Sequence, residues 1–168
     1  MKKIQAHLVG QIISSNSTEA YSLHKKSKFG EKSGEKIQYS PSEAIYLVKK
    51  TKMDLFSGNK KIPKKQLMNK FQRLDKKIYL KHIVFNDLRN RGYVLKTALK
   101  FGADFRVYKS KEKHAKWLLF IEHESEKLAL HEFAAKNRVA HSTRKKLLLA
   151  IVDDEGKITY YEIGWIRP

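Results

Sequence analysis

The sequence predicts an α+β protein built from two small domains. Three observations predict this class: strand-like segments with turns before Ser40, helical spacing of apolar residues from Ser40 to Gly92, and alternating strands after Gly92. A chain of 168 residues is long enough to bury one core or two small ones. Since no segment has the composition of a flexible linker, we place the boundary within the helical region, giving domains 1–77 and 78–168.

The predicted first domain begins with short strands. The segment KIQAHLVGQIIS has strand-like apolar content, and HKKSKFGEKSGEKIQYS carries the Gly, Ser and Lys typical of hairpin loops. A helix is predicted to begin at Ser40, because Ser40 can cap it and Pro41 suits its first turn. Glu43, three residues after Ser40, completes the pattern of a capping box.

Helical spacing continues into the middle of the chain. Leu67, Phe71 and Leu74 recur at helical intervals, and the same spacing runs from Ile78 to Leu88. Gly92 follows as a suitable C-terminal cap. This region therefore predicts helices rather than a linker.

The second half predicts a mixed sheet with at least one helix packed on it. In ADFRVYKS, Phe105 and Val107 share one strand face while Arg106 and Tyr108 share the other. The remaining segments are a core strand, AKWLLFIEH, a helix and its exit, LALHEFAAKNRVAHSTRK, and two last strands, LLLAIVDD and ITYYEIGWI. A tight acidic turn joins the last two strands.

The charge balance indicates a polyanionic partner. The chain has 36 Lys+Arg against 17 Asp+Glu, a formal net charge of +19, and a pI of about 10.0. A membrane surface is the alternative polyanion, but no apolar run approaches the roughly 20 residues of a spanning helix. The start MKKIQAHLVGQII also lacks the cleavage site of a signal peptide. We therefore expect a cytoplasmic nucleic-acid-binding protein.

Several kinds of chemistry are excluded or unsupported. The absence of cysteine excludes thiol catalysis, disulfides and thiolate zinc sites. His123, His131 and His141 lack the spacing of a metal site, so we expect surface or helix-packing roles for them and no metal. No glycine-rich phosphate loop is present, so nucleotide hydrolysis has no support.

The stretch RVAHSTRKKLLLAIV, from Arg138 to Val152, places cations directly before a predicted core strand. Desolvating a charge is costly unless something pairs with it, so these cations suggest an anion site. The alternative is the solvated rim of a helix-to-strand junction. Both interpretations fit the segment on its own.

Three side chains in the second half could cut a phosphodiester bond: Tyr108, His114 and Lys145. RNA cleavage needs a base for the 2′-hydroxyl, an acid for the departing 5′-oxygen, and a cation beside the phosphorus. Histidine suits the acid role and lysine stays cationic, whereas tyrosine is a poor base unless cations lower its pKa. Each residue also has an ordinary alternative role: Tyr108 as an aromatic at a strand end, His114 as a loop residue, and Lys145 as one of many surface cations.

The motifs of the second half resemble the archaeal tRNA-splicing endonuclease family. These are GYVLKTALKFGADFRVY, then HAKWLLF, then RVAHSTRKKLLLAIVDDEGKITYYEI, in the family's order. The first half is similar only in outline, through SPSEAIYLV and YLKHIVFNDLRNRGY. The resemblance implies a small mixed N-terminal domain followed by a nuclease-like C-terminal domain whose mixed sheet is flanked by helices.

The resemblance also implies an activity. In the family, a tyrosine, a histidine and a lysine cleave precursor tRNA at bulge-helix-bulge intron-exon junctions without a metal or other cofactor, leaving 2′,3′-cyclic phosphate and 5′-hydroxyl ends. Tyr108, after GADFRV, would be the general base, His114 the general acid, and Lys145, in HSTRK, the cation that stabilises the transition state. The stretch from Tyr108 to His114 is shorter than in some relatives.

Further residues are expected to hold RNA. The family grips a bulged base between two side chains, and Arg138 fits one of these because a guanidinium stacks on a base plane. Trp165 either supplies the second plane or is a core or interface aromatic. Arg144 and Ser142 would line the phosphate site beside Lys145.

The acidic turn predicts assembly. Asp153, Asp154 and Glu155 lie together in a very basic chain, where mutual repulsion favours a basic partner. In the family this loop enters a positive pocket of a neighbouring dimer, which implies a homotetramer or a heterotetramer with a second subunit. The competing functions are a noncatalytic RNA-binding subunit and a basic ribosome-associated protein.

Overall fold

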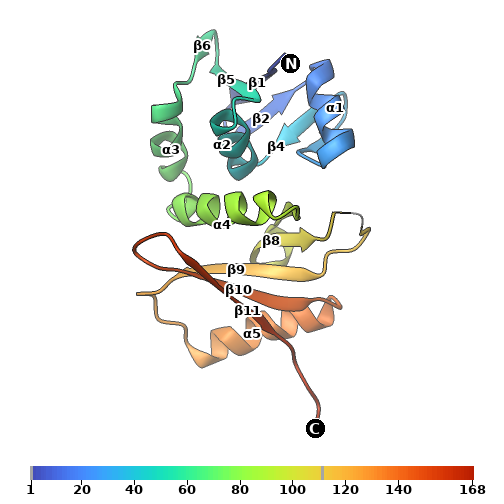
Figure 1. The fold of residues 1–168 in the computed structure, drawn as a ribbon, viewed down its shortest axis with the longest axis vertical. Coiled ribbons are helices and arrows are strands. Elements are labelled where there is room, and N and C mark those ends of the chain that lie inside the picture. Colours follow the sequence, from blue (N-terminus) through green and yellow to red (C-terminus); the bar gives the residue numbers. More distant parts are fainter. Residues whose placement is uncertain (1, 111) are drawn as a thin grey trace. The chain divides into compact units, whose positions relative to one another are not determined.

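The computed structural model describes residues 2–110 and 112–168, and confirms the α+β class (Figure 1). The chain divides into two compact units, Met1–Phe85 and Asn86–Pro168, which we call the N-terminal and C-terminal units. Each unit contains one mixed sheet with helices. The units divide inside helix α4 (Ile78–Asn90), and the boundary that the sequence favours lies at the beginning of that helix.

The sheet of the N-terminal unit has six strands in the order β3-β4-β2-β1-β5-β6. The strands are β1 (Ile4–Val9), β2 (Ile12–Ser15), β3 (Glu31–Ser33), β4 (Lys36–Tyr39), β5 (Met53–Ser57) and β6 (Lys60–Lys61). β1 pairs in parallel with β5, and the other neighbours pair antiparallel. Alternate side chains of these strands, such as Ile13, Ile37 and Leu55, are fully buried and form the core with Leu47 of α2 (Pro41–Lys49).

The predicted start of α2 is confirmed. The Ser40 hydroxyl accepts a hydrogen bond from the Glu43 N–H (3.3 Å), and the Glu43 carboxylate accepts one from the Ser40 N–H (2.9 Å). The same carboxylate accepts a bond from the Gly30 N–H (2.8 Å). A Cβ at Gly30 would lie 2.4 Å from the Ile37 side chain, and φ there is +69°, so this position requires glycine.

One helix of the N-terminal unit contradicts the prediction of strands and hairpin loops. Helix α1 (Thr18–Ser27) overlaps the segment beginning at His24 that was predicted as loop. Ser17 caps it by accepting a hydrogen bond from the Ala20 N–H (3.3 Å). Only Ala20 is fully buried in this helix, so the sequence carries no apolar stripe that would have indicated it.

The middle of the chain forms two helices rather than one continuous pattern. Helix α3 (Lys64–Gln72) ends before Leu74, which is 54% exposed although it continues the helical spacing of Leu67 and Phe71. Asp75 accepts a hydrogen bond from the Lys77 N–H (2.9 Å) just before α4 begins. At the end of α4, Gly92 adopts the left-handed conformation (φ 89°), which confirms the predicted cap.

The sheet of the C-terminal unit has five strands in the order β11-β10-β9-β8-β7. They are β7 (Val94–Ala98), β8 (Ala103–Tyr108), β9 (Trp117–His123), β10 (Lys146–Val152) and β11 (Ile158–Ile163). β9 and β10 pair in parallel and the rest antiparallel, so the predicted mixed sheet is confirmed. Helix α5 (Leu130–Ser142) covers one face, where Ala140 packs in a core cluster with Leu118 and Leu147.

The end of the chain differs from the prediction. β11 ends at Ile163, so Trp165 follows the last strand instead of lying in it. Trp165 is 51% exposed, which excludes a place in the core of this chain. Within residues 2–110 and 112–168, no helix is long and apolar enough to cross a membrane.

Candidate active site

Three strands of the C-terminal unit bring their ends together at one end of the sheet. β8 finishes there, while β9 and β10 begin there, because Val107 pairs with Trp117 and Trp117 pairs with Lys146. Backbone hydrogen bonds continue this ladder: the Lys116 N–H donates to the Val107 carbonyl (2.9 Å), and the Lys146 N–H donates to the Lys116 carbonyl (3.1 Å). Residues 108 and 145 therefore flank the start of β9.

Tyr108 lies on the sheet face that α5 covers. Side chains alternate along β8, so Tyr108 shares the face of Arg106, whose partner across the ladder is the core residue Leu118. The intervening Val107 is fully buried on the opposite face, and Tyr108 itself is half-buried. Adjacent strands lie about 4.8 Å apart, so the backbones at Tyr108 and Lys145 are separated by roughly 10 Å.

A helix cap fixes the backbone before β10. The Arg144 N–H donates to the His141 carbonyl (2.9 Å), and the Lys145 N–H donates to the Ala140 carbonyl (2.9 Å), which together form a Schellman motif. Arg144 occupies the left-handed position of this motif, with φ of 57°, where glycine is usual. A side chain in this conformation costs about 1 kcal/mol, so the arginine is not there for stability.

The ammonium of Lys145 is held without a counter-charge. Its Nζ donates to the Thr143 carbonyl (2.8 Å) and lies 5.7 Å from the ring centroid of Phe101, which packs against the core cluster under α5. Among the described residues, no carboxylate pairs with Lys145 or with Arg144. Both positive charges are therefore available to an incoming anion.

Two neighbouring lysines share one carboxylate instead. The Glu162 carboxylate pairs with Lys146 Nζ (2.5 Å) and with Lys116 Nζ (3.3 Å), and accepts a hydrogen bond from Trp117 Nε1 (2.7 Å). These hydrogen bonds lower the pKa of Glu162 to about 2, and the bond from Lys146 contributes most. Glu162 is therefore ionised at neutral pH and compensates the lysines on either side of Lys145.

A hollow of about 650 Å³ lies beside these groups, and we call it the C-terminal hollow. Its lining consists of Lys116, His141, Ser142, Arg144, Lys145 and Lys146. The structure thus brings together the predicted Ser142, Arg144 and Lys145. It adds His141, which the sequence assigned to a surface or packing role, and Lys116, which the sequence did not single out.

His141 connects the hollow to the chain end. Its ring lies 4.3 Å from the Trp165 ring, centroid to centroid, with an interplanar angle of 65°. Trp165 therefore contacts α5, the helix that carries Arg138. The contact is made at His141, about one helical turn after Arg138. The signal that could have found His141 is its position three residues after Arg138, which puts both on the same side of a helix.

The other predicted residues lie apart from the hollow's lining. His114 is exposed in the loop between β8 and β9, and Arg138 is exposed on α5. Over residues 2–110 and 112–168, no hydrogen bond joins Tyr108, His114 and Lys145 to one another. The same residues contain no group of three His, Asp or Glu side chains arranged to hold a metal ion.

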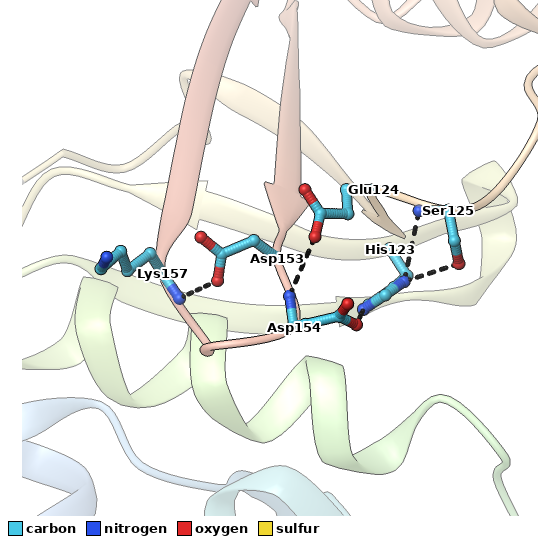
Figure 2. A network of polar contacts seen from close by, with 6 residues as sticks. All are labelled: His123, Glu124, Ser125, Asp153, Asp154 and Lys157. Atoms are coloured by element: carbon cyan, nitrogen blue, oxygen red, sulfur yellow. Dashed lines mark hydrogen bonds and ion pairs between the residues drawn. The ribbon is translucent and has the colours of Figure 1, made fainter.

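The acidic tip between β10 and β11 has basic partners within its own chain (Figure 2). Asp153 Oδ1 accepts a hydrogen bond from the Lys157 N–H (2.8 Å), and Asp154 Oδ1 lies 3.2 Å from His123 Nε2. Glu155 pairs with Lys157 Nζ (2.5 Å). The Asp154 N–H donates to the Glu124 carboxylate (3.1 Å), which adds a further negative charge beside the tip. The Asp154 side chain is 88% exposed and therefore accessible to a further partner.

Tyr108 lies at the same end of the sheet as the C-terminal hollow, whose lining includes Lys145 and Arg144, both without a carboxylate partner among the described residues. Such cations suit the binding of an anion such as a phosphate. Comparisons with known proteins identify the family. Residues 78–160 match the profile described as tRNA intron endonuclease, catalytic C-terminal domain, and residues 4–68 match tRNA intron endonuclease, N-terminal domain. The chain belongs to the tRNA intron endonuclease family and is an endoribonuclease.

Curated relatives agree over nearly the whole chain. A tRNA-splicing endonuclease of Pyrococcus abyssi is 37% identical over 99% of both chains, and one of Methanothermobacter thermautotrophicus is 34% identical over 99% of both. One of Nanoarchaeum equitans is 43% identical, covering 75% of this chain and 87% of its own. The family resemblance predicted from the sequence is therefore confirmed.

Proposed function

We propose that the chain cleaves precursor tRNA at bulge-helix-bulge intron-exon junctions, without a metal, leaving 2′,3′-cyclic phosphate and 5′-hydroxyl ends. The main support is that Tyr108 and Lys145, two of the three residues the family resemblance picks out, flank one strand at the same end of one sheet. The third, His114, belongs to the loop that connects Tyr108 to that strand. The cytoplasm is the proposed location, because it is compatible with an enzyme of tRNA splicing.

The proposed reaction is an internal transfer of the phosphoryl group. Tyr108 removes the proton of the 2′-hydroxyl, whose oxygen attacks the adjacent phosphorus and forms the cyclic phosphodiester. The bond from phosphorus to the 5′-oxygen breaks, and His114 donates a proton to that oxygen. Lys145 stabilises the negative charge that develops on the non-bridging oxygens. Atoms balance without water, because the 2′-hydroxyl is the nucleophile.

The charge distribution supports the role of Lys145. Glu162 pairs with Lys116 and Lys146 but not with Lys145, so the lysine without a carboxylate partner in this hollow is the one assigned to the phosphate. Arg144 lies next to it in the same hollow, and Ser142 contributes a hydroxyl. These two side chains are proposed to bind phosphates that flank the cleaved bond.

A bulged base is proposed to bind near the end of α5. Arg138 is exposed and offers a guanidinium plane for stacking. Trp165 is 51% exposed and lies against His141, and we propose its indole as the second plane.

A homotetramer is the proposed assembly, with a heterotetramer containing a second subunit as the alternative. β11 is an edge strand that carries the exposed Tyr161, and an exposed edge favours pairing with a second copy. The acidic tip, Asp153 to Glu155, would then dock on a positive surface of another dimer, in competition with its partners His123 and Lys157.

The test is incubation of the purified chain, in excess EDTA, with a precursor tRNA that contains a bulge-helix-bulge. We expect cyclic phosphate and 5′-hydroxyl ends, and we expect His114→Ala to abolish them while leaving RNA binding intact. His131→Ala, which removes another exposed histidine of the same unit, is the matched control and should cleave normally. RNA that binds but stays intact with the unaltered chain would contradict the proposal and indicate a noncatalytic subunit.

A further inference from the structure

The N-terminal unit contains a second basic hollow, of about 640 Å³, which we call the N-terminal hollow. It lies between α3 and the hairpin formed by β5 and β6. Its lining is Ser57, Lys60, Lys61, Ile62, Pro63, Gln66, Asn69, Lys70 and Arg73. None of these residues takes part in the proposed cleavage reaction.

The hollow follows from the two faces of α3. Leu67 and Phe71 are each 1% exposed and anchor the helix in the core. The opposite side presents Gln66, Lys70 and Arg73, spaced at i, i+4 and i+7, so that they form one continuous polar stripe. Lys60 and Lys61 of β6 line the hollow from the side of the hairpin, so basic residues from two elements surround it.

These cations are largely uncompensated. From Ser57 to Lys77 the chain has eight Lys or Arg residues and a single acidic residue, Asp75. Lys61 pairs with Asp54 (2.8 Å), but in the described part of the chain Lys60, Lys70 and Arg73 have no ion pair or side-chain hydrogen bond. All three side chains are exposed.

The charge pattern costs stability in the absence of an anion. The first turn of α3 contains Lys64 and Lys65 and no acidic residue, which is the unfavourable sign for a helix start. Unpaired like charges on neighbouring elements repel one another as well. The arrangement therefore does not serve the stability of the fold, and a bound polyanion would offset its cost.

We infer that the N-terminal hollow binds the phosphate backbone of RNA. Its cations supply the sequence-independent attraction, and the amides of Gln66 and Asn69 can bond to phosphate and ribose oxygens. A hollow lined by cations and amide side chains suits the phosphates and riboses of a nucleic-acid strand better than a flat lipid surface. The inference rests on the proposed function for the choice of precursor tRNA as ligand, but not for the phosphate chemistry.

The test is a binding titration of the full-length protein with precursor tRNA at several salt concentrations. The variant carries Lys60→Ala, Lys70→Ala and Arg73→Ala. We expect its Kd to rise about 10- to 100-fold at 0.1 M salt, and the slope of log K against log salt to fall by about 2–3, because each lost phosphate contact contributes 0.7–0.9. The single-turnover cleavage rate at saturating RNA should not change.

The matched control removes three exposed lysines of the same unit outside the hollow, by Lys25→Ala, Lys32→Ala and Lys36→Ala. Lys32 and Lys36 lie on β3 and β4, at the opposite edge of the sheet from β6. Equal weakening by both triple variants would mean a general charge effect and overturn the inference, as would unchanged binding by the hollow variant. The unaltered protein could also bind RNA without cutting it. If the hollow variant then binds RNA more weakly than both the unaltered protein and the control variant, the proposed function fails and this inference stands.

Discussion

The two hollows have similar volumes and the same number of Lys and Arg residues in their linings, four each, but their surroundings differ. The lining of the N-terminal hollow combines four cations with two amide side chains. The C-terminal hollow includes a histidine, lies at the sheet end that carries Tyr108, and has two of its lysines paired with the single carboxylate of Glu162. This difference fits the two proposed roles: the N-terminal hollow offers accessible cations for RNA binding, and the C-terminal hollow offers a fixed cation near the groups proposed to transfer protons.

The two hollows also differ in how their lysines are held. Lys145 is fixed by the Thr143 carbonyl and the Phe101 ring, and its backbone by the cap of α5. Lys70 is exposed and makes no such contacts among the described residues. A fixed charge can stabilise a transition state without reorganising, while a free one can only contribute attraction.

The largest expected effect separates these two roles. Lys145→Ala should lower the single-turnover cleavage rate by about 10²–10³-fold with little change in Kd, because the charge is required mainly in the transition state. Lys70→Ala should leave that rate unchanged and raise Kd by a few-fold. Rapid-quench cleavage at saturating RNA, together with filter binding, measures both quantities.

The adjacent Lys146 is the control for Lys145. Its charge is already paired with Glu162, so Lys146→Ala should reduce the rate much less than Lys145→Ala. Equal losses from the two substitutions would show that the local charge, and not the position of the Lys145 ammonium, controls the rate.

A second, smaller effect distinguishes the two units by their response to acid. His82 is 7% exposed and its Nε2 lies 2.9 Å from Lys49 Nζ. Burial, and then the charge of Lys49, lowers the pKa of His82 to about 4. His82 therefore binds a proton more readily in the unfolded chain than in the folded one. As the pH falls from about 6.5 to 4, the free energy of unfolding of the N-terminal unit should decrease by on the order of 2 kcal/mol.

The C-terminal unit should respond at lower pH. Its strongly shifted carboxyl, Glu162, has a pKa of about 2 in the folded state, so its contribution is lost only as the pH falls from about 4.5 towards 2. Both tryptophans, Trp117 and Trp165, lie in this unit, so their fluorescence reports on it alone. Urea unfolding should be followed by circular dichroism and by tryptophan fluorescence at pH 7 and at pH 4.5. Between these pH values, the circular dichroism transition of the N-terminal unit should shift to lower urea concentration more than the fluorescence transition does.

His82→Gln should remove this pH dependence, because the glutamine oxygen can accept a hydrogen bond from Lys49 but does not titrate. A variant whose stability between pH 7 and 4.5 still falls as in the unaltered chain would exclude His82 as the cause.

Features with local signals were predictable from the sequence. The capping box at Ser40 and Glu43, the cap at Gly92 and the buried strand after Lys145 were all predicted, since each depends on residues close in the chain. Helix α1 was not predicted, because it buries little more than Ala20 and leaves no periodic apolar pattern.

The site was predictable only in part, for a related reason. Arg144, Lys145 and Ser142 are consecutive or nearly so, and a single segment brings them to the hollow. The pairing of Glu162 with Lys116 and Lys146 depends on the register of three strands. The contact of Trp165 with His141 depends on the path that the chain takes after β11. No local pattern specifies either of these.

The smallest expected effect concerns the backbone at Arg144. Its left-handed conformation (φ 57°) would be adopted without strain by glycine, so Arg144→Gly should raise the free energy of unfolding by about 0.5–1 kcal/mol. The same change should weaken RNA binding about fivefold, because a phosphate contact is lost. Thermal unfolding and filter binding measure the two effects.

Lys28 provides the matched comparison in the N-terminal unit. It ends α1 in the same left-handed conformation (φ 58°), is exposed, and lies outside the lining of both hollows. Lys28→Gly should therefore stabilise the fold as Arg144→Gly does, while RNA binding stays close to that of the unaltered chain. If both substitutions stabilise the protein and neither weakens binding, then Arg144 does not contact RNA, and its strained backbone has no functional reason at this site.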